Sequence, residues 1–490
     1  MVMRLSRRAL LAGAASSLAT GAFADAPLTS MRPRARVPVQ DAITKMVANA
    51  GLSGSIGVVV ADIATGAYLE EIAPDVAHPP ASVTKAFTAL YAVETLGAGH
   101  QFETRIFAEG EVKDGILDGN LILAGGGDPN LVTDHLAELA QRLKATGLRE
   151  VRGDFLVWDN ALRNVAEIDA AQLDYLGYNP TITGLNLNFN RVHFEWKREG
   201  QNFVTTMDAR SENYRPAVTT ARMRVVERDS PVFSYSDAGD VDQWTVARSA
   251  LNNEGSRWLP VRHPALYAGE VFATFARSHG IVLKAPKEVM QMPAGRLLAT
   301  FQSEPLTEMM RGMLRFSTNI TAEAAGLAAT ALRTGQQRGL HTSAFGMARW
   351  ANERCGGIAP HFVDHSGLGD LSRVSPAQMV TMLTAPDVMP TLQPIMRTMP
   401  LVGDDEKVIA TRQAIVSAKT GTLNFVSSLA GYVRTEQGRD LAFAIFASDL
   451  DARAAGKLEG SEAPPGARSW NRRARDLQRE IIAHLALRAG

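Results

Sequence analysis

Strand-like segments at opposite ends of the chain constrain the fold more than any other feature of the sequence. Residues 55–72 form a β-branched run, a short turn and a second, alternating run, which is the pattern of a hairpin. Near the other end, strands are expected up to Ser417, at 429–433 and at 441–446, with the turn 436–439 joining the last two as antiparallel neighbours. We therefore expect an α/β (α+β) domain that is built from both ends of the chain and contains an antiparallel sheet flanked by helices.

A C-terminal helix is expected to cover this sheet. Residues 470–487 are amphipathic, and their apolar positions Leu477, Ile481, Ile482 and Leu485 fall on one helical face. Such a face needs an apolar partner, and the sheet supplies one.

The middle of the chain has a different pattern. Between about residues 100 and 290 short strand-like stretches dominate, with helices expected at 133–145 and 265–278. Because 490 residues exceed one ordinary core, we interpret this region as a β-rich insert. The predicted division is 25–99, 100–290 and 291–490, with the first and last segments forming one domain.

The first 24 residues have the layout of a cleaved export signal. Basic residues including Arg7 and Arg8 precede an apolar run at 9–22, which ends in the small-x-small triplet Ala22-Phe23-Ala24. We predict cleavage after Ala24. The Arg7-Arg8 pair also resembles a twin-arginine signal, and this leaves two export routes open. Since no second stretch of about 18 apolar residues follows, the mature protein is expected to be soluble.

The composition argues against several kinds of site. The 51 basic and 51 acidic residues give zero net charge, so a large basic face for nucleic acid is not indicated. The single cysteine, Cys355, allows no intrachain disulfide and is interpreted as a structural thiol. The ten histidines are scattered, and neither H-E-x-x-H nor a paired-cysteine spacing occurs, so no catalytic metal and no cofactor are expected.

A serine and a lysine three positions apart lie at the start of an apolar run, HPPASVTKAFTALYA, at residues 78–92. Pro79 and Pro80 suit the entry to a helix, and on that helix Ser82 and Lys85 would share one face. Average usage gives roughly two S-x-x-K matches by chance in a chain of this length. An ordinary helix-start serine beside a solvated lysine therefore stays open on this stretch alone.

Two more strings follow in order along the chain. Ser317-Thr318-Asn319 opens an alanine-rich helical run, and Lys419-Thr420-Gly421 ends a strand. Another S-x-N match, Ser211-Glu212-Asn213, leads into a strand-like region and is set aside. S-x-x-K at one helix start, S-x-N at another and K-T-G on a strand form the signature of penicillin-binding proteins and class A β-lactamases.

Longer strings narrow the resemblance. VDHSGLGDLSRVSP, residues 363–376, is similar to the D-G-S-G-L-S-R-x-N-R-V-S-P string of the penicillin-binding protein 4 type D-alanyl-D-alanine carboxypeptidases and endopeptidases. LILAGGGDPNL, residues 121–131, resembles the Gly-Gly-Asp-Pro string inside that family's insert. The 235 residues between Ser82 and Ser317 fit an insert of that size and exceed a small β-lactamase.

The resemblance implies a serine DD-peptidase that cleaves peptidoglycan stem peptides and is acylated by β-lactams. It implies that Ser82 forms an acyl-enzyme, with Lys85 as its base when neutral and Ser317 as a proton relay. Asn319 would bind the substrate amide, and Lys419 would act as a second cation that lowers the pKa of Lys85.

The same resemblance implies the substrate contacts around the K-T-G string. Lys419 and Thr420 would hold the terminal carboxylate, and the N–H groups of Ser82 and Thr422 would form the oxyanion hole, with Gly421 between them in the string.

Two further substrate contacts are weighed against ordinary roles. Asp159 matches an aspartate that meets the diaminopimelate amine in related enzymes, and Asn424 could reach the same side chain; a plain turn residue is the alternative for each. The glycine-rich residues 124–130 lack Gly-Lys-Ser/Thr, so they are interpreted as a tight turn rather than a phosphate loop.

Several departures from the family strings concern substrate preference. Thr318 replaces an aspartate, His365 replaces a glycine, Gly369 and Ser372 replace a serine and an asparagine, and Asp370 replaces an arginine. If that arginine holds a negative part of the stem, Asp370 reverses the charge.

The expected partners are therefore stem peptides and β-lactams, and not nucleic acid, with the periplasm as the expected location. A homodimer and peripheral membrane association stay open, as does the balance of carboxypeptidase and endopeptidase activity. The alternatives are a catalytically silent wall-binding protein and a β-lactamase.

Overall fold

The computed structural model describes residues 41–402, 407–409, 411–458 and 461–488. The predicted export signal at 1–24, with its Arg7-Arg8 pair, lies outside the described residues. Within the described ranges, no helix is both long and apolar enough to cross a bilayer.

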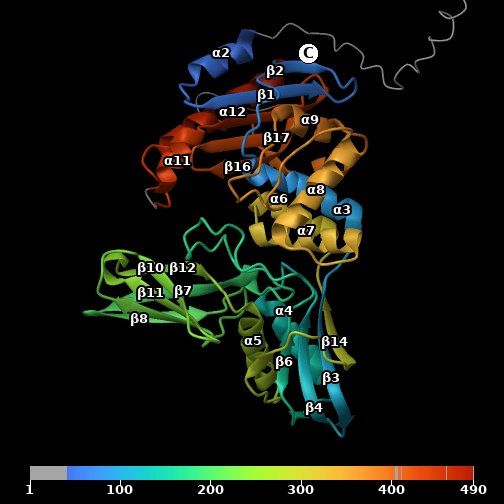
Figure 1. Ribbon diagram of the computed structural model, residues 1–490, viewed down its shortest axis with the longest axis vertical. Helices are drawn as coiled ribbons and strands as arrows, with labels where there is room; N and C mark the ends of the chain where they lie inside the picture. The colour runs from blue at the N-terminus through green and yellow to red at the C-terminus, as the bar shows by residue number, and fades with distance from the viewer. Residues whose placement is uncertain (1–40, 403–406, 410, 459–460, 489–490) are drawn as a thin grey trace, which may run out of the picture. The chain divides into compact units, whose positions relative to one another are not determined.

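Six strands from both ends of the chain form one antiparallel sheet (Figure 1). Their order is β15-β16-β17-β18-β1-β2. Their bounds are β1 Ser55–Asp62, β2 Tyr68–Ile72, β15 Arg397–Met399, β16 Ile415–Leu423, β17 Val426–Arg434 and β18 Asp440–Ser448. β1 and β18 pair along their length, with Val58 opposite Ile445, so the two ends of the chain meet inside the sheet. The antiparallel sheet expected from the sequence is confirmed, but β16 continues past its predicted end at Ser417.

Helices cover both faces of this sheet (Figure 1). The side chains of β1 alternate between two cores: Val58 and Val60 pack with α2 and α12, whereas Val59 and Ala61 pack with α3 and α6 to α9. This double burial explains why β1 is apolar at successive positions. The helices of this part are α2 Asp41–Asn49, α3 Thr84–Leu96, α6 Leu306–Phe316, α7 Asn319–Thr334, α8 Leu340–Cys355, α9 Pro376–Thr384, α10 Val388–Leu392, α11 Leu450–Leu458 and α12 Ala467–Arg488. As predicted, α12 covers the sheet through Leu477, Ile481, Ile482 and Leu485.

The middle of the chain forms three sheets and two helices that share one core. A six-stranded sheet holds β3 Glu103–Lys113, β4 Ile116–Gly125, β5 Glu150–Val151, β6 Phe155–Trp158, β13 Pro286–Glu288 and β14 Arg296–Gln302. Two three-stranded sheets hold β7 Arg191–Glu199, β8 Asn202–Asp208, β9 Ala221–Val226, β10 Phe233–Asp237, β11 Asp242–Ala247 and β12 Glu254–Pro260. The helices are α4 Thr133–Ala145 and α5 Pro264–Ser278, close to their predicted bounds. Because β14 pairs with β3, strand pairing in this region extends to Gln302; the division at 99 and 290 itself stays a prediction.

Candidate active site

Ser82 lies in a single 3-10 turn, Ala81–Val83, immediately before α3. Pro79 and Pro80 lead into this turn, and Ala81 adopts a positive φ of 46°. A non-glycine residue in this conformation persists only where its surroundings fix it. The turn sets Ser82 at the start of the buried helix and not within its regular body.

The Lys85 amine is buried and donates to oxygens from three parts of the chain. Its acceptors are Ser82 Oγ at 3.0 Å, Asn319 Oδ1 at 2.8 Å and the Ser366 carbonyl at 2.7 Å. Burial lowers the pKa of Lys85 to about 8, against opposing effects of the Glu323 and Asp364 carboxylates. The alternative of a solvated lysine does not describe Lys85, whose side chain is fully buried.

Two buried carboxylates hold the loop that supplies the Ser366 carbonyl. Glu323 accepts the N–H groups of His365 and Ser366 at 2.9 and 2.8 Å. Asp364 accepts those of Gly367 and Gly369 at 2.6 and 2.5 Å. Burial raises the pKa values of both carboxyl groups. These positioning contacts were missed in the sequence, although Glu323 is the one charged residue in the alanine-rich run 319–332.

Ser317 and Lys419 form a second contact beside the first. Ser317 ends α6 in the left-handed region, with φ 61°, and Asn319 begins α7. Lys419 Nζ donates to Ser317 Oγ at 3.0 Å and to the Thr420 carbonyl at 2.7 Å. Burial, and then the charge of Lys85, lower the pKa of Lys419 well below its ordinary value.

The end of β16 passes against the Ser82 turn because Gly421 has no side chain. An ideal Cβ on Gly421 would lie 2.6 Å from the Pro80 carbonyl oxygen and 2.9 Å from Ser82 N. β15 pairs only with Val416–Ala418 of β16. Within the described ranges, the stretch from Lys419 onward therefore has no strand paired on that side, and an open strand edge is where an extended peptide can add.

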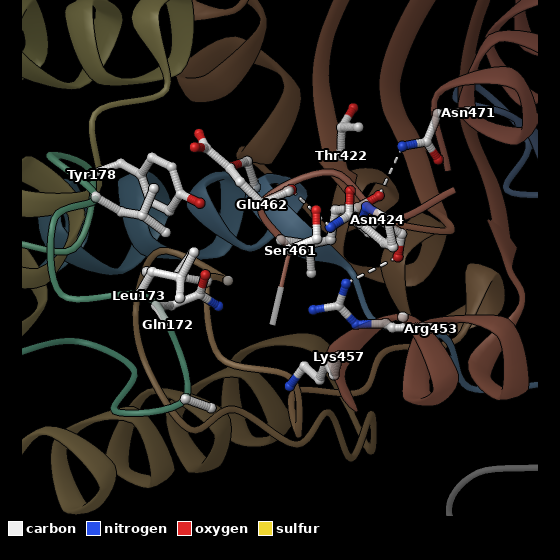
Figure 2. Close-up of a pocket in the computed structure, with 18 of the residues that line it drawn as sticks. Gln172, Leu173, Tyr178, Thr422, Asn424, Arg453, Lys457, Ser461, Glu462 and Asn471 are labelled. Atoms are coloured by element: carbon white, nitrogen blue, oxygen red, sulfur yellow. Dashed lines mark hydrogen bonds between the residues drawn. The ribbon is translucent and has the colours of Figure 1, made fainter. Parts of the chain in front are cut away.

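A pocket of about 410 Å³ opens at this point and is lined by Ser82, Ser317, Asn319, Thr422 and Asn424. Figure 2 shows Gln172, Leu173 and Tyr178 from the middle of the chain across the pocket from Arg453 and Lys457 of α11. These five wall residues were not found in the sequence analysis, because no motif there connects them to the three strings.

Asn319 and Asn424 are each held by contacts at the pocket. Asn319 Nδ2 donates to the Tyr178 carbonyl at 2.8 Å. Asn424 Nδ2 donates to the Glu462 carbonyl at 3.1 Å, and the Asn424 carbonyl accepts from Arg453 Nη1 at 2.9 Å (Figure 2). Asn424 lines the pocket, and the substrate contact predicted for it from the sequence stays a prediction.

Two other predicted substrate-binding residues lie away from this pocket. Thr420 lines a separate hollow with Met399 and Ile482, because strand alternation turns its side chain away from Lys419. Asp159 is 3% exposed and is not among the residues that line the pocket with Ser82. Burial, and then the charge of Glu288, raise the pKa of Asp159 to about 6. The geometry gives no support to a side-chain contact from either residue.

The structure shows how the chain accommodates Asp370 in place of an arginine. Arg453 Nε donates to Asp370 at 2.6 Å, and Lys457 pairs with the same carboxylate. Although burial raises the pKa of Asp370, these two cations bring it below its ordinary value. The negative charge is therefore neutralised, and the expected reversal of charge at the pocket does not follow.

His365, which replaces a glycine, is buried next to Ser366, whose carbonyl accepts from Lys85. Its ring is hydrogen-bonded to Ser343 Oγ at 2.8 Å and packs against Gly326. A Cβ atom added to Gly326 would lie 2.2 Å from the ring, so only glycine fits there. Burial lowers the pKa of His365 to about 3, so the ring is neutral. This departure alters packing and not the pocket wall.

Comparisons with known proteins identify a matching family, similar sequences and a similar fold. A sequence model described as the D-Ala-D-Ala carboxypeptidase 3 (S13) family matches residues 39–462. The chain is 29% identical over 490 aligned positions to the D-alanyl-D-alanine carboxypeptidase of Actinomadura sp. (strain R39), covering 88% of this chain and 86% of that protein. It is 26% identical over 402 positions to D-alanyl-D-alanine carboxypeptidase DacB of Haemophilus influenzae, covering 77% and 81%. The crystal structure of penicillin binding protein 4 (dacB) from Haemophilus influenzae has the same fold, with a TM-score of 0.72 and 21% identity over 90% of this chain and 99% of that chain.

Proposed function

The chain belongs to the D-Ala-D-Ala carboxypeptidase (S13) family, and on this premise we propose that Ser82 is the nucleophile that cleaves peptidoglycan stem peptides. The chain is a serine-type D-alanyl-D-alanine carboxypeptidase. The observation that carries the assignment of Ser82 is the position of Lys85 Nζ, within 3.0 Å of both Ser82 Oγ and Asn319 Oδ1. This contact joins the first two motifs across more than 230 residues of chain.

Acylation begins when neutral Lys85 takes the proton of Ser82 Oγ. The oxygen then bonds to the carbonyl carbon of the penultimate D-Ala, and the C–N bond to the last D-Ala breaks. Ser317, in contact with Lys419, passes a proton to the leaving amine and recovers one from the Lys85 ammonium, so the proton taken from Ser82 ends on the departing D-Ala and Lys85 is neutral again. Water hydrolyses the acyl-enzyme in the second half-reaction and restores the Ser82 hydroxyl.

The backbone N–H groups of Ser82 and Thr422 stabilise the oxyanion. The close approach of β16 to the Ser82 turn, which Gly421 permits, supports this role. A donor of this kind contributes roughly 3 kcal/mol to transition-state stabilisation.

Lys419 binds the terminal carboxylate of the stem. Its buried amine has a lowered pKa, and an arriving carboxylate favours the protonated form and so strengthens its own binding site. The hydroxyl that assists Lys419 is that of Thr422, which lies on the same strand and lines the pocket. Thr420 lines a different hollow and does not take this role.

Asn319 holds both the base and the substrate. Its oxygen accepts from Lys85, and one of its two amide N–H groups donates to the Tyr178 carbonyl. An amide nitrogen carries two N–H groups, so the second one meets the amide carbonyl of the substrate.

Labelling with a tagged penicillin tests the nucleophile. The wild-type protein is expected to become covalently labelled, and Ser82→Ala is expected to abolish the label. Ser211→Ala is a matched control, because Ser211 begins the S-x-N match outside the site, and it is expected to label normally. Label that persists in Ser82→Ala contradicts the assignment.

Product analysis separates the competing activities. The protein is incubated with purified cross-linked muropeptides, and the products are identified by mass spectrometry. Loss of one D-Ala shows carboxypeptidase activity, and separation of the two stems shows endopeptidase activity. Binding without any product identifies a silent wall-binding protein, and rapid repeated turnover of nitrocefin identifies a β-lactamase.

We also propose export to the periplasm, where peptidoglycan lies. The layout of residues 1–24 supports this location. Fractionation of cells carrying Arg7→Lys with Arg8→Lys tests the route, since loss of the mature form from the periplasm supports twin-arginine export. A homodimer and peripheral membrane association stay predictions.

A further inference from the structure

The glycine-rich string at 124–130 ends beside the catalytic S-x-N motif, although the sequence indicates only a tight turn there. Asn130 of this string accepts a hydrogen bond from Thr321 Oγ1 at 3.1 Å, and Thr321 lies in the first turn of α7. The middle of the chain therefore contacts the helix that presents Asn319.

The contact continues to the middle residue of the S-x-N motif. Thr318 Oγ1 donates to Thr321 Oγ1 at 2.9 Å. Thr318 is the N-cap residue of α7, yet its hydroxyl does not cap a backbone N–H of that helix. A threonine at this position usually makes the capping bond, so its hydroxyl is used instead to connect the motif to Asn130.

Asn130 is itself held from two other directions. Its backbone N–H donates to Asp128 Oδ1 at 2.9 Å, and its Nδ2 donates to Glu304 at 3.2 Å. With its nitrogen facing Glu304, the amide presents its oxygen to Thr321. These two contacts orient Asn130 independently of α7.

The first residue of the S-x-N motif is strained. Ser317 adopts a φ of 61° between α6 and α7, a strained conformation for a non-glycine residue that needs support from its surroundings. On one side of the motif, Asn319 is tethered to the Tyr178 carbonyl. On the other, Thr318 is tethered through Thr321 to Asn130.

We propose that Asn130 and Thr321 are positioning residues, which hold Ser317 and Asn319 in the geometry that acylation requires. The proposal rests on the proposed function, because it takes Ser317 and Asn319 as catalytic groups. Neither Asn130 nor Thr321 is among the residues that line the pocket, and their hydrogen bonds lead to the motif through Thr318. The insert therefore contributes Asn130 as a residue that positions catalytic groups.

Two threonine-to-valine substitutions on the same helix provide a matched test. Thr321 and Thr330 are both buried in α7, and each hydroxyl has two side-chain partners: Thr318 and Asn130 for the first, Tyr91 and Ser343 for the second. Thr321→Val and Thr330→Val therefore remove equivalent hydrogen bonds and are expected to lower the unfolding midpoint similarly. Only Thr321 is connected to the S-x-N motif.

The readout is the second-order rate of acylation by a tagged penicillin. Thr321→Val and Asn130→Ala are each expected to lower this rate by about 10- to 100-fold, because a displacement of about 1 Å at the reacting groups has an effect of that size. Thr321→Ser keeps the hydroxyl and is expected to restore the rate, and Thr330→Val is expected to leave it unchanged. Thr321→Val acylated as fast as Thr330→Val overturns the proposal.

Hydrogen–deuterium exchange gives a second readout that does not depend on activity. Amides of residues 317–320 are expected to exchange faster in Thr321→Val than in wild type or Thr330→Val, because the first turn of α7 is less tightly held. Equal exchange in all three proteins overturns the proposal. An unlabelled wild-type protein contradicts the proposed function instead, and the exchange measurement then still decides whether Asn130 and Thr321 hold the motif.

Discussion

The rate of acylation is expected to follow the fraction of Lys85 that is neutral. Burial lowers the pKa of this amine to about 8 from an ordinary value of 10.5. The difference corresponds to about 3 kcal/mol and raises the neutral fraction at pH 7 from about 0.03% to about 9%. Placing the lysine inside the protein therefore increases the amount of active base roughly 300-fold at that pH.

Rapid-quench measurement of acylation by a tagged penicillin between pH 6 and 9.5 tests this value. The rate is expected to rise about tenfold per pH unit below pH 8 and to level off above it. Lys45→Met, at an exposed lysine of α2, is expected to leave the midpoint unchanged, whereas Lys85→Met is expected to remove acylation at every pH. Circular dichroism across the same range checks that the fold persists. A rate independent of pH from 6 to 9, or a midpoint near 10.5, refutes Lys85 as the base.

Three further substitutions test separate parts of the site. Lys85→Met is expected to raise the unfolding temperature at pH 7, because the pKa of Lys85 is lower in the folded than in the unfolded state, so that its protonation destabilises the fold. This destabilisation is complete below pH 8 and disappears as the pH rises toward 10.5. A gain in unfolding temperature that is the same at pH 7 and pH 9.5 contradicts this reasoning. Gly421→Ala is expected to slow acylation by roughly 100-fold, since its Cβ would meet the backbone beside the nucleophile, and Gly312→Ala, with open space around its Cβ position, is the control in the same labelling assay. Asp370→Asn is expected to lower KM for stems that carry an additional carboxylate while kcat stays the same, because it leaves the two cations of α11 unneutralised; an unchanged KM at low salt contradicts a role for their charge.

The placement of the three motifs was accessible from the sequence because each has a local structural signature. Ser82 follows two prolines before an apolar helix, Asn319 opens an alanine-rich helix, and Lys419 belongs to a strand. That both ends of the chain form one domain followed from their strand-like segments, whereas the pairing of β1 with β18 is known only from the structure. Strand alternation also predicts that Thr420 points away from Lys419, a step that the motif-based interpretation did not include.

The contacts that tune the site were not accessible, because each joins residues with no shared local pattern. Glu323 holds the Ser366 loop through backbone N–H groups, and any sequence can supply those. Asp370 is neutralised by Arg453 and Lys457 of α11, and the sequence does not indicate this because the effect of one charged residue depends on which residues the fold brings beside it. The expected role of Asp159 rested on a family match, whereas its burial depends on the packing of the surrounding loop.

The pairing of β1 with β18 also determines when, during synthesis, the domain that carries Ser82 can fold. About 390 residues separate Val58 from Ile445, so the sheet beside Ser82 lacks its central strands until the C-terminal part of the chain has been synthesised. Contacts of such long sequence separation form late and slowly, whereas β3 to β14 complete their own sheets from a continuous segment. A nascent or C-terminally truncated chain therefore carries the serine and its lysine without the sheet that completes the site, and hydrolytic activity is withheld until synthesis of the protein is finished.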